Sequence, residues 1–526
     1  MSSTVRALVR VTVGRDRVLG PVALYVVAGY TLAQAAAIHW GYASPEDRHG
    51  LARTAQGNAT YAALLGPARA LDDLGGLTAW RTVVVGATFA GLTGLLLAVR
   101  HTRAEEELGR GELLLAGAVG RRAPAGVALG WIAALQVAGG AVLAIGLMAL
   151  GLPVVGAVLQ GAAVAAVGVL FAAVAVLASQ LVATARAARA VAGVALGTAF
   201  LLRAVTDAGG PDAFRWVTPL GWAEEVAPFT ANDPAPLLLL VAATMVVVAV
   251  ALRLQGARDH GTGLLTRTTP GPDRASARLR GVYGLTIRRQ RSAVAGWGAG
   301  LFAVGAAVGA VATSADDLLG DGGTGAKLLD RAGGDPVDAF LSSTSTVVAM
   351  LACGFTLQAL LRLRRDEVSG LLEATLATAT RRRQTLLGAH VVVAGIGSVV
   401  VLLCAGVGLL VVLTLSGDPG HGVDGLLATL SRTPALWVLG AVSALLVGAA
   451  PRASALGWAA LASCLALWII DPLLGLPTAV SDVSPFGLLP DLPAAPFGAV
   501  ATAALIAATA VVLALADAAL RRRDLT

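Results

Sequence analysis

The chain has 526 residues, of which 56% are hydrophobic and only 13% are charged, and its formal net charge is +7 at pH 7. Its mean hydropathy is +0.76, and apolar runs of about 18 residues or more recur along its length. These values exclude an ordinary soluble domain and predict an all-α polytopic membrane protein.

The first 17 residues, MSSTVRALVRVTVGRDR, are basic and amphipathic, which predicts an interfacial helix ahead of the first span. No A-x-A cleavage site with a soluble domain behind it follows the apolar run at 18–38. A cleaved signal peptide is therefore not predicted.

Segments long enough to cross about 30 Å of hydrocarbon then follow one another to the C-terminus. We predict about 12 transmembrane helices in two sets of six. The first set is 18–38, 79–99, 124–148, 153–181, 188–206 and 234–253, and the second is 293–313, 341–361, 385–415, 434–450, 454–471 and 497–518.

The distribution of arginine indicates the orientation of these spans. If both termini are cytoplasmic, the inner segments hold 30 of the 39 lysines and arginines. Cytoplasmic loops retain basic residues, so this topology is favoured.

Two charged blocks lie between apolar runs and resemble each other: TRAEEELGRGELLLAGAVGRR at 102–122 and RRDEVSGLLEATLATATRRR at 364–383. An offset of 261 aligns them and pairs Glu105 with Asp366, Glu106 with Glu367, Gly109 with Gly370 and Glu112 with Glu373. The likeness extends to VTVGRDR at 11–17 with LTIRRQR at 285–291, and to VTPLG at 217–221 with VSPFG at 483–487.

This repeat predicts two homologous six-helix halves, at 1–253 and 285–526, joined by an Arg-rich cytoplasmic linker at 254–284. Because both halves have the same orientation, they are expected to be related by a pseudo-twofold axis along the membrane normal.

If each block is one helix, Glu105, Gly109 and Glu112 lie on a single face, and Asp366, Gly370 and Glu373 repeat it. Glu106 could also pair with Arg110 at i,i+4, but such a pair contributes only about 0.2–0.5 kcal/mol. A surface for a cytosolic partner explains the recurrence better than local helix support does. The alternative is a connector whose charges only keep the loop inside.

The pattern RAEEELGRGELLLAGAVGRR after the second span, with a weaker copy after the eighth, resembles the permeases of actinobacterial ABC exporters for polyketide antibiotics or multiple drugs. The resemblance covers essentially the whole chain and implies the type V fold of ABCG-like exporters. It also implies that the two blocks couple to ATPase subunits, through Glu105, Glu106, Gly109, Arg110 and Glu112 in the first block and Asp366, Glu367, Gly370 and Glu373 in the second. The second copy departs from the pattern at Val368, Leu371 and Leu372, so equivalence of the two sites is not implied.

The resemblance further implies two copies of a separate ATPase that binds ATP and Mg, in the cell membrane of a high-GC actinobacterium. The single lysine, Lys327 in GDGGTGAKLL, lacks the Gly-Lys-Ser/Thr ending of a P-loop, so the chain is not predicted to hydrolyse ATP. No catalytic, metal or cofactor site and no nucleic-acid partner is predicted.

The expected substrate is a small hydrophobic or amphipathic compound, because the spans carry few fixed charges. Drugs, lipids and glycoconjugates fit this description equally. An ion-coupled secondary transporter is a less favoured alternative, since its pathway would need ionisable groups near the membrane midplane. A non-transporting membrane protein is a third.

Two further features concern packing and the outer surface. Glycines at four-residue spacing favour close helix packing over a cavity lining: Gly126 and Gly130, Gly193 and Gly197, Gly296 and Gly300, and Gly305 and Gly309. The connectors at 206–229 and 470–497 resemble short outer-leaflet helices, although ordinary interfacial loops would also suit them.

Overall fold

The computed structural model describes most of the chain, in the segments 3–42, 44–55, 62–63, 65–109, 120–207, 211–257, 263–265, 279, 281–312, 336–377, 388–474 and 482–523. Eleven helices in these segments are long and apolar enough to cross a membrane. A further apolar stretch, Leu456–Trp468, belongs to helix α24 (Leu456–Leu474). Every predicted span therefore falls on a helix, and the prediction of an all-α polytopic membrane protein is confirmed.

The chain divides into two compact units, Met1–Pro270 and Gly271–Thr526. The division falls within the predicted linker, whose own boundaries at 254–284 stay a prediction. The near-P-loop around Lys327 lies outside the described residues.

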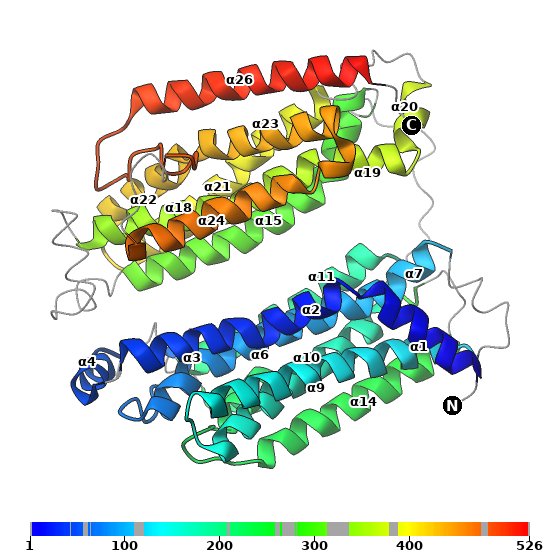
Figure 1. Cartoon of the computed structure of the whole chain (residues 1–526), viewed down its shortest axis with the longest axis vertical. Coiled ribbons are helices and arrows are strands. Elements are labelled where there is room, and N and C mark those ends of the chain that lie inside the picture. Colours follow the sequence, from blue (N-terminus) through cyan, green and yellow to red (C-terminus); the bar gives the residue numbers. More distant parts are fainter. Residues whose placement is uncertain are drawn as a thin grey trace. The chain divides into compact units, whose positions relative to one another are not determined.

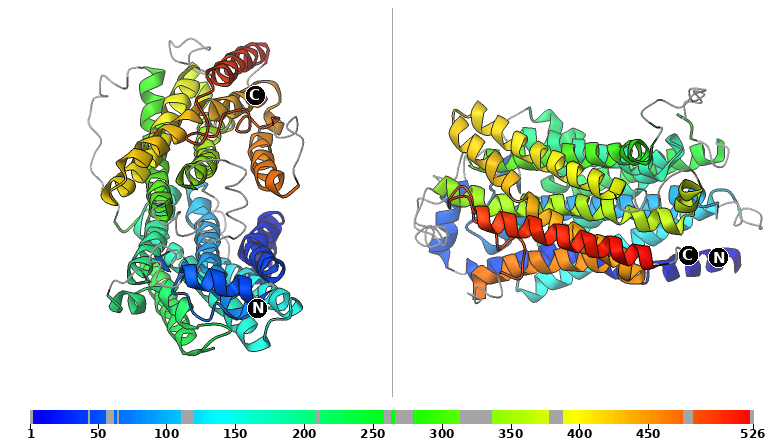
Figure 2. Two further views of the ribbon diagram at one scale, coloured as in Figure 1. Left: turned by 90° about the vertical axis from the view of Figure 1, so that its left-hand side faces the viewer. Right: turned by 90° about the horizontal axis from the view of Figure 1, so that it is seen from above.

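In the first unit the long helices run side by side (Figures 1 and 2). The spans are α2 (Leu19–Leu24) continued by the π-helix η1 (Tyr25–Gly29) and α3 (Tyr30–Gly41), then α6 (Leu74–His101), α9 (Ala123–Ala149), α10 (Val154–Leu181), α11 (Ala185–Asp207) and α14 (Ala235–Ala257). The shorter helices are α1 (Ser3–Arg15), α4 (Pro45–Ala55), α7 (Arg103–Glu107), α12 (Ala213–Val217) and α13 (Pro219–Glu225).

Helix α10 is the centre of this unit and contacts α6, α9, α11 and α14. Small residues allow the backbones to meet, as expected for helix association in lipid. A Cβ on Gly140 of α9 would lie 2.4 Å from the Gly161 carbonyl oxygen, and one on Gly161 of α10 would lie 2.3 Å from the Gly140 oxygen. Where helix backbones approach this closely in lipid, dispersion contacts take the place of the hydrophobic effect that drives helix packing in water.

The second unit is also built of long helices that run side by side (Figure 1). Its helices are α15 (Val282–Ala312), α18 (Pro336–Leu360), α19 (Arg362–Val368), α20 (Leu371–Leu376), α21 (Ala389–Leu415), α22 (Pro419–Ser431), α23 (Thr433–Ala449), α24 and α26 (Ala499–Arg522). Helix α15 packs on α21 through Gly305, where a Cβ would lie 1.9 Å from the Ala405 carbonyl oxygen.

Helix α22 lies in a stretch predicted to be an external loop before a span at 434–450; together with α23 it forms one candidate span, Pro419–Ala449, so the predicted start of that span is wrong. It joins α23 at Arg432, whose side chain is fully buried. The Arg432 guanidinium donates to the carbonyl oxygens of Phe486 and Leu489 and pairs with Asp491 at 2.8 Å. The helix was missed because its stretch PGHGVDG has turn-forming residues, whereas tertiary contacts hold it helical.

The two connectors predicted to lie on the outer side differ. The first forms the short helices α12 and α13, and the Thr218 hydroxyl caps α13 by accepting from the Gly221 amide at 3.0 Å. In the second, the described residues 482–498 form turns and no helix. The expectation of short helices is thus met in the first connector but not in the described part of the second.

Candidate functional site

In the first unit the charged block begins with α7, at the end of α6. Arg15, the last residue of α1, pairs with Glu105 at 2.5 Å. The next residue, Asp16, has a fully buried carboxylate that contacts Arg100 and lies 2.6 Å from the His101 Nε2. It also accepts from the Trp131 indole at 2.9 Å. These contacts fasten α1 to the ends of α6 and α9.

Arg103 joins α7 to the connection between α10 and α11. Its side chain is 1% exposed, and it donates to the Ala183 carbonyl oxygen from Nε at 2.9 Å and from Nη2 at 2.6 Å. The remaining nitrogen, Nη1, pairs with Glu106 at 2.8 Å. Glu107 accepts from the Ala185 amide at 2.8 Å. Hence α7 is anchored on two sides.

The second unit forms the corresponding pairs around α19. Arg289, which the repeat aligns with Arg15, donates from both terminal nitrogens to both oxygens of Asp366, each at 2.6 Å. Arg364 pairs with Glu367 at 2.8 Å, as Arg103 does with Glu106. Glu367 also contacts Arg523 near the C-terminus, which donates to the Val447 carbonyl oxygen at 2.6 Å. His390 lies 3.6 Å from Asp366.

The glycines aligned by the repeat share one backbone conformation. Gly109 has φ of +70° and Gly370 has φ of +73°, in the left-handed region that favours glycine. Each amide donates at 3.0 Å to a carbonyl oxygen three residues earlier, that of Glu106 or Glu367. Both helices therefore end here, as is typical of glycine after a helix C-terminus.

This corrects the prediction of a single helical face. Asp366 lies on α19 and Glu373 on α20, with the left-handed Gly370 between them, so their helical spacing does not continue across the block. Glu106 pairs with Arg103 at i,i+3; Arg110 and Glu112 lie outside the described residues. The recurring glycine ends each helix, which the regular spacing of these residues in the sequence did not predict.

Replacing Gly109 and Gly370 together by alanine is expected to destabilise the ends of both helices by about 1–2 kcal/mol each, because a Cβ is disfavoured in the left-handed region. The pair of asparagine replacements should cost less, since asparagine tolerates this conformation. Thermal unfolding of the two double variants tests this. Equal losses for alanine and asparagine would contradict it.

The recurring carboxylates are largely buried against other parts of the chain and are little exposed to solvent. Side-chain exposure is 18% for Glu105, 8% for Glu106, 8% for Asp366 and 5% for Glu367. Glu373 and Gly109, in contrast, are exposed. Large apolar side chains are also exposed beside the helix stops, with Leu108 at 61% and Val368 at 71%.

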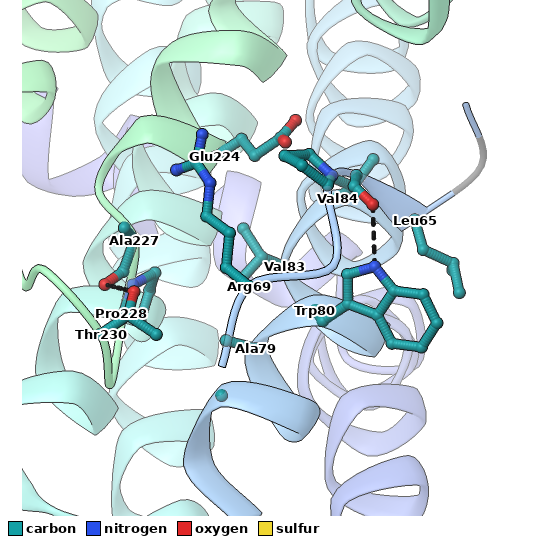
Figure 3. A pocket seen from close by; sticks show the side chains of 13 residues that line it. Leu65, Arg69, Ala79, Trp80, Val83, Val84, Glu224, Ala227, Pro228 and Thr230 are labelled. Atoms are coloured by element: carbon teal, nitrogen blue, oxygen red, sulfur yellow. Dashed lines mark hydrogen bonds between the residues drawn. The ribbon is translucent and has the colours of Figure 1, made fainter. Parts of the chain in front are cut away.

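A second cluster of charges lies in the first unit at the opposite end of α6. Arg203, fully buried on α11, is 3.1 Å from Asp207 and 3.8 Å from Glu224 of α13. Glu224 and Arg69 both line a cavity of about 40 Å³ (Figure 3), and Arg69 pairs with Glu225 at 2.8 Å. No local sequence pattern indicates this cluster, because its members come from distant segments.

Gly66 makes room for the Glu224 carboxylate. It has φ of +100°, and a Cβ there would lie 2.7 Å from Glu224 Oε1. Its carbonyl oxygen accepts from the Trp80 indole at 2.8 Å (Figure 3). The pKa of Glu224 is raised to about 8, mainly by burial and also by the neighbouring Asp207 carboxylate, while Arg203 and Arg69 oppose the shift.

This pKa predicts a pH-dependent stability. The folded state keeps the Glu224 proton up to about pH 8, whereas the unfolded chain releases it near 4.5. The contribution is therefore fully present below 4.5 and is lost as the pH rises toward 8, with a slope of at most about 1.4 kcal/mol per pH unit. Glu224→Gln should flatten this slope in thermal unfolding, while the adjacent Glu225→Gln should keep it. An unchanged slope in Glu224→Gln would contradict the assignment.

The fold and the charged sites together define a class: a multi-pass membrane protein whose two units carry the same ion pairs and the same glycine helix stop after their second span. Comparison with known proteins gives the family. The model for the multidrug efflux system permease Rv1217c, C-terminal domain, matches residues 279–521. The chain is also 35% identical over 523 residues to the multidrug efflux system permease protein Rv1217c of Mycobacterium tuberculosis, covering 98% of this chain and 94% of that protein. The chain therefore belongs to this family of multidrug efflux permeases, and the resemblance identified in the sequence is confirmed.

Proposed function

We propose that the chain is the transmembrane subunit of an ABC exporter that moves hydrophobic or amphipathic compounds, drugs included, out of the cell. The observation that carries this proposal is the relation to a multidrug efflux permease over 98% of the chain. The matched ion pairs after the second span of each unit support it, since they hold a polar element firmly at one end of each helix bundle.

Energy is supplied in trans, by two copies of an ATPase subunit that carry ATP and Mg. Each copy docks on one charged block, with both termini of the permease in the cytoplasm. The paired carboxylates brace α7 and α19 against the spans, while Gly109, Glu373 and the apolar side chains Leu108 and Val368 offer the exposed contact surface. Movement of an ATPase subunit against the exposed ends of α7 and α19 is transmitted to the membrane spans through these ion pairs.

The test is ATP hydrolysis by the purified chain, alone and after co-expression with the ATPase encoded beside it, together with a subunit count of the isolated complex. We expect activity only in a complex of one permease and two ATPases. A stable, monodisperse chain that recruits no ATPase would overturn the proposal and favour an ion-coupled transporter.

A further inference from the structure

A cavity of about 90 Å³ lies in the first unit, at the end that carries α7. Its lining comes from α1, from the last residue of α6, from α7, from the start of α9 and from the last turns of α10 and α14. Because the apolar spans end here, the cavity lies at the level of the lipid headgroups and not in the hydrocarbon. It is too small for a drug-sized ligand, whose sites measure about 300–1,000 Å³.

The lining of this cavity is amphipathic. Helices α1 and α9 supply apolar side chains to it, among them Leu8, Val11, Pro124 and Val127. Charged side chains from α1, from α7 and from the residues just before α9 line the rest. A ligand that fits both parts of the lining must itself carry a polar group next to an apolar one.

The charged side chains of the lining leave one cation over. Arg15 pairs with Glu105 at 2.5 Å, and Arg103 pairs with Glu106 at 2.8 Å. Arg121 is exposed, and its side chain has no hydrogen bond or ion pair with any residue that the structure describes. Since both carboxylates of the lining already have a cation, the cavity suits an anionic group and not a cationic one.

Arg15 can donate to the same anion. A guanidinium has five N–H groups, and among the described residues Arg15 uses only Nη1, for Glu105. Its side chain is 32% exposed, so the remaining donors are accessible. His101 also lines the cavity, but its Nε2 lies 2.6 Å from the buried carboxylate of Asp16 and is directed into the unit.

Helix α1 extends the positive charge beside this cavity. Arg6, Arg10 and Arg17 are exposed, and none of them has an ion pair with a described residue. Arg6 and Arg10 are one turn apart and therefore lie on one face of the helix. Val11, which is 52% exposed, offers apolar area on the same helix. A basic helix with apolar side chains is typical of a segment that lies on anionic lipid.

We propose that this cavity holds the phosphate of an anionic phospholipid, such as phosphatidylglycerol, and that Arg121 and Arg15 donate to that phosphate. The glycerol and the first methylene groups of the acyl chains lie against Val11 and Val127. A free phosphate ion would use the arginines but not the apolar part of the lining. A zwitterionic lipid would bring an ammonium group for which the lining has no spare carboxylate. The lipid is a resident partner of the chain and not a transported compound, so its binding requires neither an ATPase nor export.

The experiment uses the full chain in detergent micelles and measures bound lipid by native mass spectrometry, with phosphatidylglycerol and phosphatidylcholine of equal chain length as probes. We expect one phosphatidylglycerol to bind at least about tenfold more tightly than phosphatidylcholine. Arg121→Gln should weaken phosphatidylglycerol about fivefold, the effect of one arginine at an anionic headgroup, and it breaks no contact with a described residue. The matched control, Arg189→Gln, removes an exposed arginine of α11 that does not line the cavity and should stay within about twofold of the wild type.

A second pair of variants tests the apolar part of the lining. Val11→Asn should weaken phosphatidylglycerol about threefold, because it replaces apolar contact area with an amide of similar size. Val13→Asn is its control, since Val13 is exposed on the same helix but does not line the cavity. Equal losses in these two variants would overturn the assignment of the acyl chains to this lining.

Two further results would overturn the proposal as a whole: equal binding of the two lipids, or equal effects of Arg121→Gln and Arg189→Gln. Inorganic phosphate and glycerol 3-phosphate are added as soluble competitors. Displacement of phosphatidylglycerol by either of them at a comparable concentration would show a site for a soluble phosphate and overturn the lipid assignment. Each of these results is independent of whether the complex exports drugs.

Discussion

Replacing Gly305 by valine is expected to prevent the second unit from assembling, whereas the same replacement at Gly300 should leave it intact. Both glycines lie on α15. A Cβ at 305 would be 1.9 Å from the Ala405 carbonyl oxygen of α21, while one at 300 meets no described atom within 4 Å. A clash with backbone cannot be relieved by a rotamer change, so the cost should reach at least about 3 kcal/mol, the upper end for overpacked cores.

The two variants carry the same change in helix propensity, so their difference isolates the packing term. Thermal unfolding followed by size-exclusion chromatography measures it: the Gly305→Val sample should be aggregated or strongly destabilised, and the Gly300→Val sample should resemble the wild type. Equal melting temperatures for the two variants would mean that α15 and α21 pack less closely than they do in the structure.

Reversing the charge of Asp366 with Asp366→Arg is expected to reduce export at least tenfold and to destabilise the second unit by about 3–5 kcal/mol. The substitution breaks a largely buried pair and leaves Arg289 facing a second cation. The result would identify this pair as a mechanical link between α15 and α19, provided that the loss can be reversed.

Reversal is tested by the swap, Arg289→Asp with Asp366→Arg, which restores the opposite charges and should recover a substantial part of both stability and export. Arg291→Asp serves as the control for net charge, because Arg291 lies two residues away and is exposed. A swap that performs no better than Asp366→Arg alone would show that the geometry of the original bidentate pair, rather than its charge, is required.

The charged blocks show what sequence can and cannot reveal about such a site. Alignment of the two halves identified Glu105 with Asp366 and Gly109 with Gly370 as equivalent. In the structure both carboxylates pair with an aligned arginine, and both glycines have the same left-handed backbone. The alignment could not reveal the ion-pair partners of these carboxylates, because Arg15 is 90 residues from Glu105 and Arg289 is 77 residues from Asp366. The functions assigned to these residues stay predictions.

The glycine pairs make the same point for packing. Spacing alone favoured packing for all four pairs, yet only Gly305 and Gly309 approach a neighbouring helix closely. A Cβ at any member of the other three pairs would meet no described atom within 4 Å. Spacing places two glycines on one face of a helix but does not say what that face meets.

Sequence by itself determined the membrane class, the spans and the internal repeat, because crossing about 30 Å of hydrocarbon imposes a length and an apolarity that each segment must satisfy locally. Tertiary structure alone decided which charges are buried and paired, where α7 and α19 stop, and where the helix ends of the first unit enclose a cavity. These features depend on contacts between side chains of helices that are far apart in the sequence, and local sequence patterns do not predict such contacts.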